Sequence, residues 1–313
     1  MLEFLDPRAP VCPQKLLERA RNASSRPRVA VANAGAPLPM AACKAATEAG
    51  LIQPVLVGNR EDIIDEARAL AWNIETFELI EADSEVSAAR ASMQAVRDGR
   101  ADVLMKGQLH TDVFMKAALD RDTGIRDGRR FVHVFHITTP DSERPLLISD
   151  CAVNVAPDLK TRQIAVDCLM DVFAALDITQ PKIAVLSATE EVIASVPSAL
   201  EADELVQWGR DAHPDAVFSG PLALDLIFSK AAAKIKGRDK DPVTGNADAI
   251  IVPDLVSGNA LFKALVYLKA GCAAGVVMGG RVPVVLTSRA DPPDARLASI
   301  ALAAVLHGPR SKT

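Results

Sequence analysis

The chain has 313 residues, a length that is typical of about two domains. Its 35 basic and 40 acidic residues give a net charge of −5, which argues against a surface for nucleic acid but leaves room for a local basic pocket. Apolar residues make up 49% of the chain and charged residues 24%, so chain-wide disorder is excluded and a globular protein is expected.

The cysteines indicate a reducing compartment. They are five in number, widely spaced and without a Cys-x-x-Cys pair, so we expect neither a disulfide framework nor a cysteine zinc site. The first ten residues contain Asp6 and Pro7 where a signal peptide needs an unbroken apolar stretch. No apolar run is long enough to cross a membrane, and we therefore expect a cytoplasmic protein.

The first third of the chain alternates short apolar runs with helix-length segments. We expect strands at 28–34, 54–58, 77–82 and 102–107, and helices at 39–50, 59–71, 84–99 and 110–120. Asn59 and Ser84 are suited to cap two of these helices, and Gly50 to end another. A repeat of strand and helix at this spacing predicts a parallel sheet covered by helices.

The rest of the chain continues this pattern with one exception. The strands expected at 129–139 and 145–151 are joined by a short polar turn, so they must be antiparallel. Further strands are expected at 182–188, 247–254, 273–280 and 283–288, and helices at 158–177, 197–212, 258–270 and 293–307. The basic, Gly- and Pro-containing segment 234–248 is expected to be a loop.

Ligands of α/β proteins bind where strands end, and the last strand ends in a dense group of polar residues. Ser288, Arg289, Asp291 and Asp294 follow it directly, just before a helix whose free N–H groups suit an anion. Arg289 can hold a phosphate with two hydrogen bonds, or it can form a surface ion pair. Asp291 precedes Pro292 and is also a good helix N-cap.

Two other regions carry polar residues at strand ends. After 102–107, Lys106 and Gly107 suit anion capture, since glycine lets a backbone N–H approach a ligand, while His110 and Thr111 open the next helix. His110 could act as a general base. The alternatives are that Lys106 is an ordinary solvated lysine and that His110 is an ordinary surface histidine.

The other candidates follow two strands in the second half of the chain, and each has a structural alternative. The polar residues there are Asp150, Asn154, Asp254, Ser257, Gly258 and Asn259. Gly258 and Asn259 can simply cap the following helix. Cys151 is expected to be buried, because no neighbouring cation would activate it as a nucleophile.

Several common signatures are missing from the sequence. It contains no GxGxxG, GxxxxGK[ST], HExxH or GxSxG motif, which removes the usual signals for dinucleotide binding, P-loop hydrolysis, zinc proteolysis and serine hydrolysis.

Five segments, in order along the chain, resemble the phosphate acyltransferases, the family of phosphate acetyltransferase and phosphate butyryltransferase. They are LMKGQLHTDVFMKAAL (104–119), SDCAVNVAPDL (149–159), KIAVLSATE (182–190), PDLVSGNALFK (253–263) and RVPVVLTSRAD (281–291). The sequences of these segments are most similar to the acetyl/butyryl branch, which includes the acyltransferase module of bifunctional enoyl-CoA hydratase/phosphate acetyltransferases.

The resemblance implies a fold, a reaction and a site. The fold is two three-layer α/β/α domains with mainly parallel sheets and an interdomain cleft, as in isocitrate and isopropylmalate dehydrogenases. On this basis we place residues 1–145 and 285–313 in the first domain and 146–284 in the second. The reaction is acyl-CoA + phosphate ⇌ acyl phosphate + CoA, without a metal or redox cofactor and usually in a homodimer. Ser288 and Arg289 would act on the reacting phosphate and thioester, with the other strand-end residues binding substrate.

Two positions depart from the family pattern. Phosphate acetyltransferases carry an Asp, proposed as a base for the CoA thiol, seven residues after the Ser, and this chain has Ala295 there. The alternatives are that Asp291 is the base for the CoA thiol, that Asp294 is, or that the reaction uses no base. The family often has a basic residue at the position of Asn246, so Lys236 or Arg238 would have to supply a contact to CoA phosphates.

Two other functions remain open from the sequence. A metal-dependent NAD dehydrogenase of the same fold would need aspartates or histidines clustered at one strand end, and we find no such pattern. An acyl-CoA- or phosphate-binding pseudoenzyme is favoured by the missing Asp at Ala295 and the missing basic residue at Asn246.

Overall fold

The computed structural model describes residues 4–287 and 290–307. The chain forms two compact units, each built from two separate stretches of sequence. The first comprises residues 1–9 and 132–273, and the second comprises 10–131 and 274–313. The predicted domain boundary near residue 145 falls inside a strand, whose hairpin partner lies in the same unit.

The second unit holds a mostly parallel sheet with strand order β3-β2-β1-β4-β11-β10. Its strands are β1 (Arg28–Ala32), β2 (Gln53–Gly58), β3 (Glu78–Glu81), β4 (Val103–Lys106), β10 (Cys272–Met278, beginning at the unit boundary) and β11 (Val284–Val285). Only β10 runs antiparallel to its neighbour β11. This topology places the ends of β1, β4 and β11 at one edge of the sheet.

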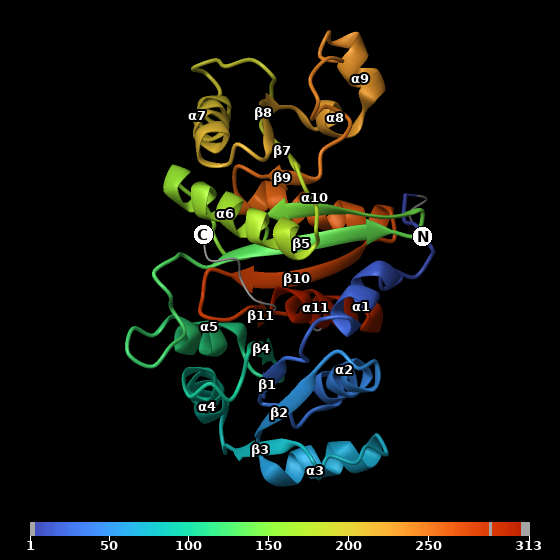
Figure 1. Ribbon diagram of the computed structural model, residues 1–313, viewed down its shortest axis with the longest axis vertical. Coiled ribbons are helices and arrows are strands. Elements are labelled where there is room, and N and C mark those ends of the chain that lie inside the picture. Colours follow the sequence, from blue (N-terminus) through green and yellow to red (C-terminus); the bar gives the residue numbers. More distant parts are fainter. Residues whose placement is uncertain (1–3, 288–289, 308–313) are drawn as a thin grey trace. The chain divides into compact units, whose positions relative to one another are not determined.

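Helices cover both faces of this sheet (Figure 1). They are α1 (Gln14–Arg21), α2 (Pro37–Glu48), α3 (Arg60–Ala69), α4 (Glu85–Arg97), α5 (Thr111–Leu119) and α11 (Pro293–Leu306). The expected caps are confirmed: Asn59 accepts the N–H groups of Glu61 and Asp62, and Ser84 forms a capping box with Ser87. Gly50 ends α2 with a φ of 76°.

The first unit has strand order β5-β6-β9-β7-β8. Its strands are β5 (Val132–Thr139), β6 (Ser142–Ser149), β7 (Lys182–Leu186), β8 (Val217–Leu222) and β9 (Ala249–Ile251). Its helices are α6 (Leu159–Ala175), α7 (Pro197–Ala212), α8 (Leu224–Phe228), α9 (Lys230–Ile235) and α10 (Leu255–Leu268). The predicted antiparallel pair is β5–β6, and the other pairs are parallel. The mixed α/β fold class is therefore confirmed.

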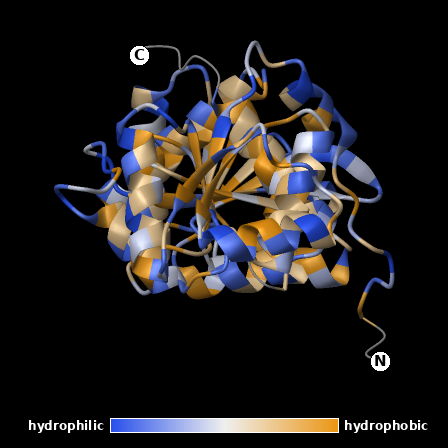
Figure 2. Cartoon of the chain, turned by 90° about the horizontal axis from the view of Figure 1, so that it is seen from below, coloured by the Kyte–Doolittle hydropathy of each residue, from blue (hydrophilic) through white to orange (hydrophobic). Residues whose placement is uncertain are grey.

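Burial follows the expected pattern. Strands β9 and β10 are buried at every position, and Figure 2 shows hydrophobic residues concentrated on the central strands while the helices alternate in character. Helix α11 is an exception among the helices, because eleven of its residues are buried. No helix in the described part of the chain is long and apolar enough to span a membrane.

Candidate functional site

Three parallel strands bring the first group of candidate residues to one edge of the sheet in the second unit. Lys106, the last residue of β4, pairs with Ala32 at the end of β1. Val285 of β11 pairs with Met105, so the segment that leaves β11 at Thr287 emerges beside Lys106. This register brings the ends of β1, β4 and β11 together at an edge of the kind where α/β proteins bind their ligands.

Gly107 makes the turn after β4 against the backbone of β1. Its N–H donates to the carbonyl of Ala32 at 2.9 Å, and the N–H of Gln108 donates to that of Asn33 at 2.9 Å. A Cβ on Gly107 would lie 2.4 Å from the Ala32 carbonyl oxygen, which is too close for any side chain. The need for glycine therefore comes from the neighbouring strand, and its N–H is already engaged rather than free for a ligand.

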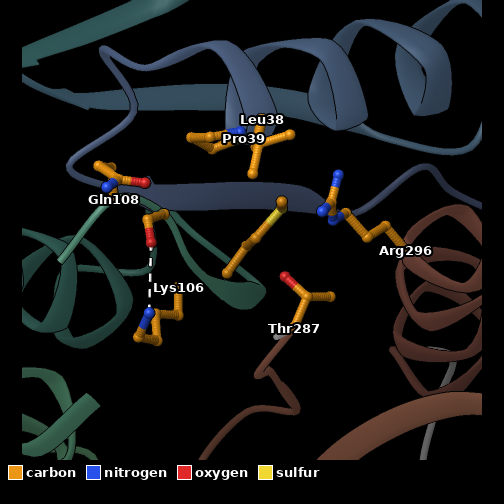
Figure 3. Close-up of a pocket in the computed structure, with 8 residues that line it drawn as sticks. Leu38, Pro39, Lys106, Gln108, Thr287 and Arg296 are labelled. Carbon is orange, nitrogen blue, oxygen red and sulfur yellow. Dashed lines mark hydrogen bonds between the residues drawn. The ribbon is translucent and has the colours of Figure 1, made fainter. Parts of the chain in front are cut away.

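A pocket opens at this edge, within the second unit (Figure 3). The empty space at this edge is about 330 Å³, and this figure includes open solvent. The lining residues are Leu38, Pro39, Met105, Lys106, Gly107, Gln108, Thr287 and Arg296. Two cations and a hydroxyl thus face the same space as three apolar side chains, which suits a small anion that carries a short apolar group.

Arg296 is a charged pocket residue that was not singled out from the sequence. It is the fourth residue of α11 and only 8% exposed. In Figure 3 its guanidinium points toward Leu38 and Pro39, on the other side of the pocket from Lys106. A signal was available, because Asp294 and Arg296 are the only charged residues in a helix made otherwise of apolar residues, serine and its initial proline.

The four residues proposed as catalytic come just before and within the start of α11. Ser288 and Arg289 lie outside the described residues, so their predicted roles stay predictions. Asp291 is not the N-cap: that position belongs to Pro292, and no side chain caps the helix. The prediction that Asp291 caps this helix was wrong, because α11 begins at Pro293, a residue type favoured at the first helical position, and the N-cap is therefore Pro292.

Asp294 has a structural contact. Its Oδ1 accepts the N–H of Cys12 at 3.0 Å, which ties the segment before α1 to the first turn of α11. Ala295, at the position where the family pattern has an Asp, is 5% exposed and accepts the hydroxyl of Ser299 at 2.8 Å. Position 295 therefore offers no acid or base, and the neighbouring carboxylate of Asp294 is hydrogen-bonded to the backbone of Cys12.

His110 and Thr111 lie at the start of α5 and are exposed. The imidazole Nδ1 of His110 is 2.9 Å from Oε2 of Glu85, and its backbone N–H donates to the same oxygen at 3.0 Å. These two hydrogen bonds lower the pKa of Glu85. Neither residue lines the pocket.

In the first unit, Asp150 and Asn154 form a tight local turn after β6. Oδ1 of Asp150 accepts the N–H groups of Ala152 and Val153, both at 2.9 Å. Its Oδ2 accepts the backbone N–H of Asn154 at 3.3 Å and the side-chain amide at 2.6 Å. Asp150 is 4% exposed, so its carboxylate serves chiefly to satisfy this turn.

The remaining candidate residues of this unit lie at the start of α10. Asp254 is the N-cap and accepts the N–H of Ser257 at 2.8 Å. The expected cap at Gly258 and Asn259 was therefore wrong, since α10 begins at Leu255 and both residues lie inside it. Gly258 is required there because a Cβ would lie 2.9 Å from the Asp150 carbonyl oxygen and 3.0 Å from Sγ of Cys151.

Two buried histidines in β5 were not singled out from the sequence. His133 is 2% and His136 3% exposed, and neither Nδ1 has a hydrogen-bond partner. Burial lowers the pKa of each to about 4, and for His133 the charge of Asp150 partly opposes this shift. Both imidazoles are neutral near neutral pH.

The cysteines are all free and buried, as expected. Burial raises the pKa of Cys12 and of Cys43 to about 12, and it raises that of Cys151 further. None of these three thiols is prepared to act as a nucleophile.

The loop around Asn246 holds its cations in ion pairs. Arg144 donates to Oδ1 of Asn246 at 3.0 Å and to Asp248 at 2.6 Å. Lys236 lies 3.1 Å from Asp225 and 3.3 Å from Glu190. Arg144 thus contacts Asn246, the position where the sequence lacks a basic residue, and carboxylates partly neutralise both Arg144 and Lys236.

Among the described residues, no group of three or more histidines, cysteines, aspartates and glutamates is placed to hold a metal ion.

Comparison with known proteins agrees with the motifs. Residues 84–304 match the family described as phosphate acetyl/butaryl transferase. The chain is 41% identical to a phosphate acetyltransferase of Rhizobium meliloti, over 83% of this chain and 82% of that protein. It is 34% identical to a phosphate butyryltransferase of Clostridium acetobutylicum, over 90% of this chain and 93% of that one. A solved branched-chain phosphotransacylase from Enterococcus faecalis V583 is 28% identical with a TM-score of 0.79, covering 90% and 98% of the two chains. The resemblance found in the sequence is therefore confirmed, and the chain belongs to the phosphate acetyl/butyryl transferase family.

Proposed function

We propose that the protein catalyses reversible acyl transfer between CoA and inorganic phosphate, with acetyl or butyryl as the acyl group. The observation that carries this proposal is identity of up to 41% to a phosphate acetyltransferase over most of both chains. The cationic pocket at the strand ends of the second unit supports it, because both phosphate and acyl phosphate are small anions. Acetyl phosphate or butyryl phosphate is the expected product.

The reaction passes through one tetrahedral intermediate. An oxygen of HPO₄²⁻ attacks the thioester carbonyl carbon, a C–O bond forms, and the carbonyl oxygen becomes an oxyanion. The C–S bond then breaks and sulfur leaves with the electron pair as a thiolate. The proton released from the phosphate goes to water or to that thiolate, so acyl-CoA and phosphate yield acyl phosphate and CoA.

We assign the charged steps to the residues at the strand ends of the second unit. Arg289 stabilises the oxyanion or the phosphate, Ser288 donates to it, and Lys106 attracts the anionic substrate. A thiol with a pKa of about 8.5 ionises readily, so a dedicated base contributes little. The engagement of Asp294 with Cys12 supports this assignment.

The transfer is proposed to be direct, in a ternary complex, without an acyl-enzyme. The raised pKa values of Cys12, Cys43 and Cys151 support this, because a thiolate is the nucleophilic form.

The test is thiol release from acetyl-, propionyl- and butyryl-CoA with and without phosphate, together with detection of acyl phosphate. We expect phosphate-dependent release and initial-rate lines that intersect. A ping-pong pattern or a mass increment on Cys151 would overturn direct transfer. CoA binding without any turnover would instead make the protein a pseudoenzyme, and NAD binding would favour the dehydrogenase alternative.

Three further properties belong to the same proposal. We propose a homodimer, a cytoplasmic location and no metal or redox cofactor. The free, buried cysteines support a reducing compartment. Light scattering at twice the mass of one chain, and activity that survives EDTA, are the expected results.

A further inference from the structure

We propose that His110 carries the proton of the acyl transfer, taking it from phosphate and delivering it to the CoA sulfur, and that Glu85 is the residue that positions its ring. The inference rests on the proposed function and deepens it, because the motifs leave open whether His110 is a base or an ordinary surface histidine. It starts from the contact between the first residue of α4 and the N-cap of α5.

Glu85 holds His110 at two points. Glu85 is the first residue of α4, whose start is fixed by the capping box of Ser84, and His110 is the N-cap of α5. Oε2 of Glu85 accepts the backbone N–H of His110 at 3.0 Å and lies 2.9 Å from Nδ1 of its imidazole. The other oxygen, Oε1, is 3.1 Å from the same Nδ1. One carboxylate therefore holds both the backbone and the ring, so the direction of the ring is fixed although the side chain is 70% exposed.

This contact decides which nitrogen of His110 carries the proton. An ionised carboxylate only accepts hydrogen bonds, so Nδ1 is the donor and Nε2 of the neutral ring keeps its lone pair. The hydrogen bonds from His110, together with the charge of Lys106, lower the pKa of Glu85 and so keep its carboxylate ionised. Nε2 has no hydrogen-bond partner among the residues that the structure describes. An imidazole with a carboxylate on Nδ1 and an open Nε2 is arranged to accept a proton.

The pair Glu85–His110 lies beside the pocket. Only Leu109 separates His110 from residues 106–108, which line it. Leu109 is 1% exposed and its N–H donates within the same turn at 3.1 Å, which anchors the backbone between the pocket and His110. The ammonium of Lys106 is near enough for its charge to act on Glu85. Because His110 is not part of the lining, an anion in the pocket leaves its Nε2 accessible to the sulfur of CoA.

The proton moves from phosphate to sulfur through Nε2 of His110. As an oxygen of HPO₄²⁻ bonds to the carbonyl carbon, the phosphate O–H gives its proton to Nε2, which becomes part of an imidazolium. When the C–S bond breaks, sulfur keeps the electron pair and takes that proton. His110 is neutral again, and acyl-CoA and HPO₄²⁻ have become acyl phosphate and CoA thiol. The negative charge of Glu85 stabilises the imidazolium between the two steps.

A second histidine–carboxylate pair in the first unit provides a matched control. Nε2 of His213 lies 2.9 Å from Oδ1 of Asp167, the same separation as in the pair of His110. The side chain of His213 is only 20% exposed, and its ring packs against Trp208 and Phe218. Its surroundings therefore indicate a structural role, and replacing it removes a comparable hydrogen bond away from the proposed site.

The experiment compares His110→Ala, Glu85→Gln and His213→Ala with the wild type, with and without added imidazole. Phosphate-dependent CoA release, after subtraction of the rate without enzyme, gives kcat and the KM of each substrate. For His110→Ala we expect kcat to fall by about tenfold with KM for phosphate nearly unchanged. This loss is below the roughly 10²–10⁴ usual for acid–base catalysis, because a thiolate already leaves readily.

Imidazole is the readout that a purely structural role would not move. It should restore part of kcat in His110→Ala, where it can occupy the space of the missing ring. Glu85→Gln keeps its ring but loses the charge that stabilises the imidazolium, so it should lose a smaller factor that imidazole does not restore. His213→Ala should lower Tm and keep its kcat. Melting curves confirm that each variant is folded.

Four outcomes would overturn the inference. The first is an active wild type with a His110→Ala variant whose kcat stays within about threefold, and this result leaves the proposed function intact. The second is a loss in His110→Ala that imidazole does not restore, since the ring would then be structural. The third is an equal loss in His213→Ala, which would trace the effect to destabilisation. The fourth is a wild type that transfers no acyl group to phosphate, which overturns the proposed function as well.

Discussion

The strand ends of both units carry polar residues, but the two units use them differently. In the first unit, Asp150 and Asp254 are occupied by backbone N–H groups of their own turn and helix. In the second unit, Lys106 at the end of β4 faces a pocket that Arg296 of helix α11 also lines, and none of the lining residues carries a carboxylate. The difference shows that a polar residue at a strand end indicates a binding site only when it also faces open space, as Lys106 does although its Nζ donates a long hydrogen bond of 3.4 Å to the carbonyl of Gly107.

Acid should destabilise the first unit in particular, through its buried histidines. His133 and His136 have a pKa of about 4 when folded and about 6.5 when unfolded, so below pH 6.5 the unfolded chain takes up more protons. The free energy of unfolding should therefore fall as the pH drops from about 6.5 to about 4, by at most about 3 kcal/mol per histidine. His136→Leu, which has one such group fewer, should show a smaller fall of Tm over this range, and an identical fall would contradict the assignment.

Loss of Arg289 should have the largest effect on activity. Arg289→Ala is expected to reduce kcat/KM by at least about a hundredfold, the scale of removing one charge-stabilising donor, with little change in Tm. Lysine should substitute poorly because it lacks the planar fork. Activity within threefold of the wild type would remove Arg289 from the mechanism.

Asp254 and Asp291 both precede helices, but replacing them should lower the free energy of unfolding by different amounts. Asp254→Ala removes the N-cap of α10 and should cost about 1 kcal/mol, whereas Asp291→Ala should cost clearly less because Asp291 is not the cap of α11. Denaturant unfolding of both variants measures this difference. Equal losses would mean that Asp291 supports the helix in another way.

Asp294→Ala should have the smallest effect on activity. It removes the acceptor for the Cys12 N–H, so we expect a modest fall in Tm and a loss in rate of less than about tenfold, short of a full general base. A thousandfold loss with unchanged Tm would instead identify Asp294 as the base.

Much of the fold could be predicted because local signals decided it. Asn59, Ser84 and Asp158 begin their helices with side-chain caps, and α7 spans the predicted residues. Strand β8 was missed because Gly220-Pro221 argues against a strand, but β8 pairs only with β7, and an edge strand tolerates proline.

The site could be predicted less well because tertiary contacts decided it. Gly258 suggests a helix cap from sequence alone, yet it lies within α10 because Asp150 and Cys151 leave no room for a side chain. Arg296 lines the pocket together with Leu38 and Lys106, which lie far away in the sequence.

The most direct test of this account compares one residue from each unit in the same assay. The rate of phosphate-dependent CoA release is measured for Lys106→Met and Asp254→Asn, both confirmed as folded by their melting curves. We expect kcat/KM for phosphate to fall by at least about tenfold in Lys106→Met and to stay within about threefold in Asp254→Asn. A large loss in Asp254→Asn with little change in Lys106→Met would place the phosphate chemistry in the first unit and contradict the account.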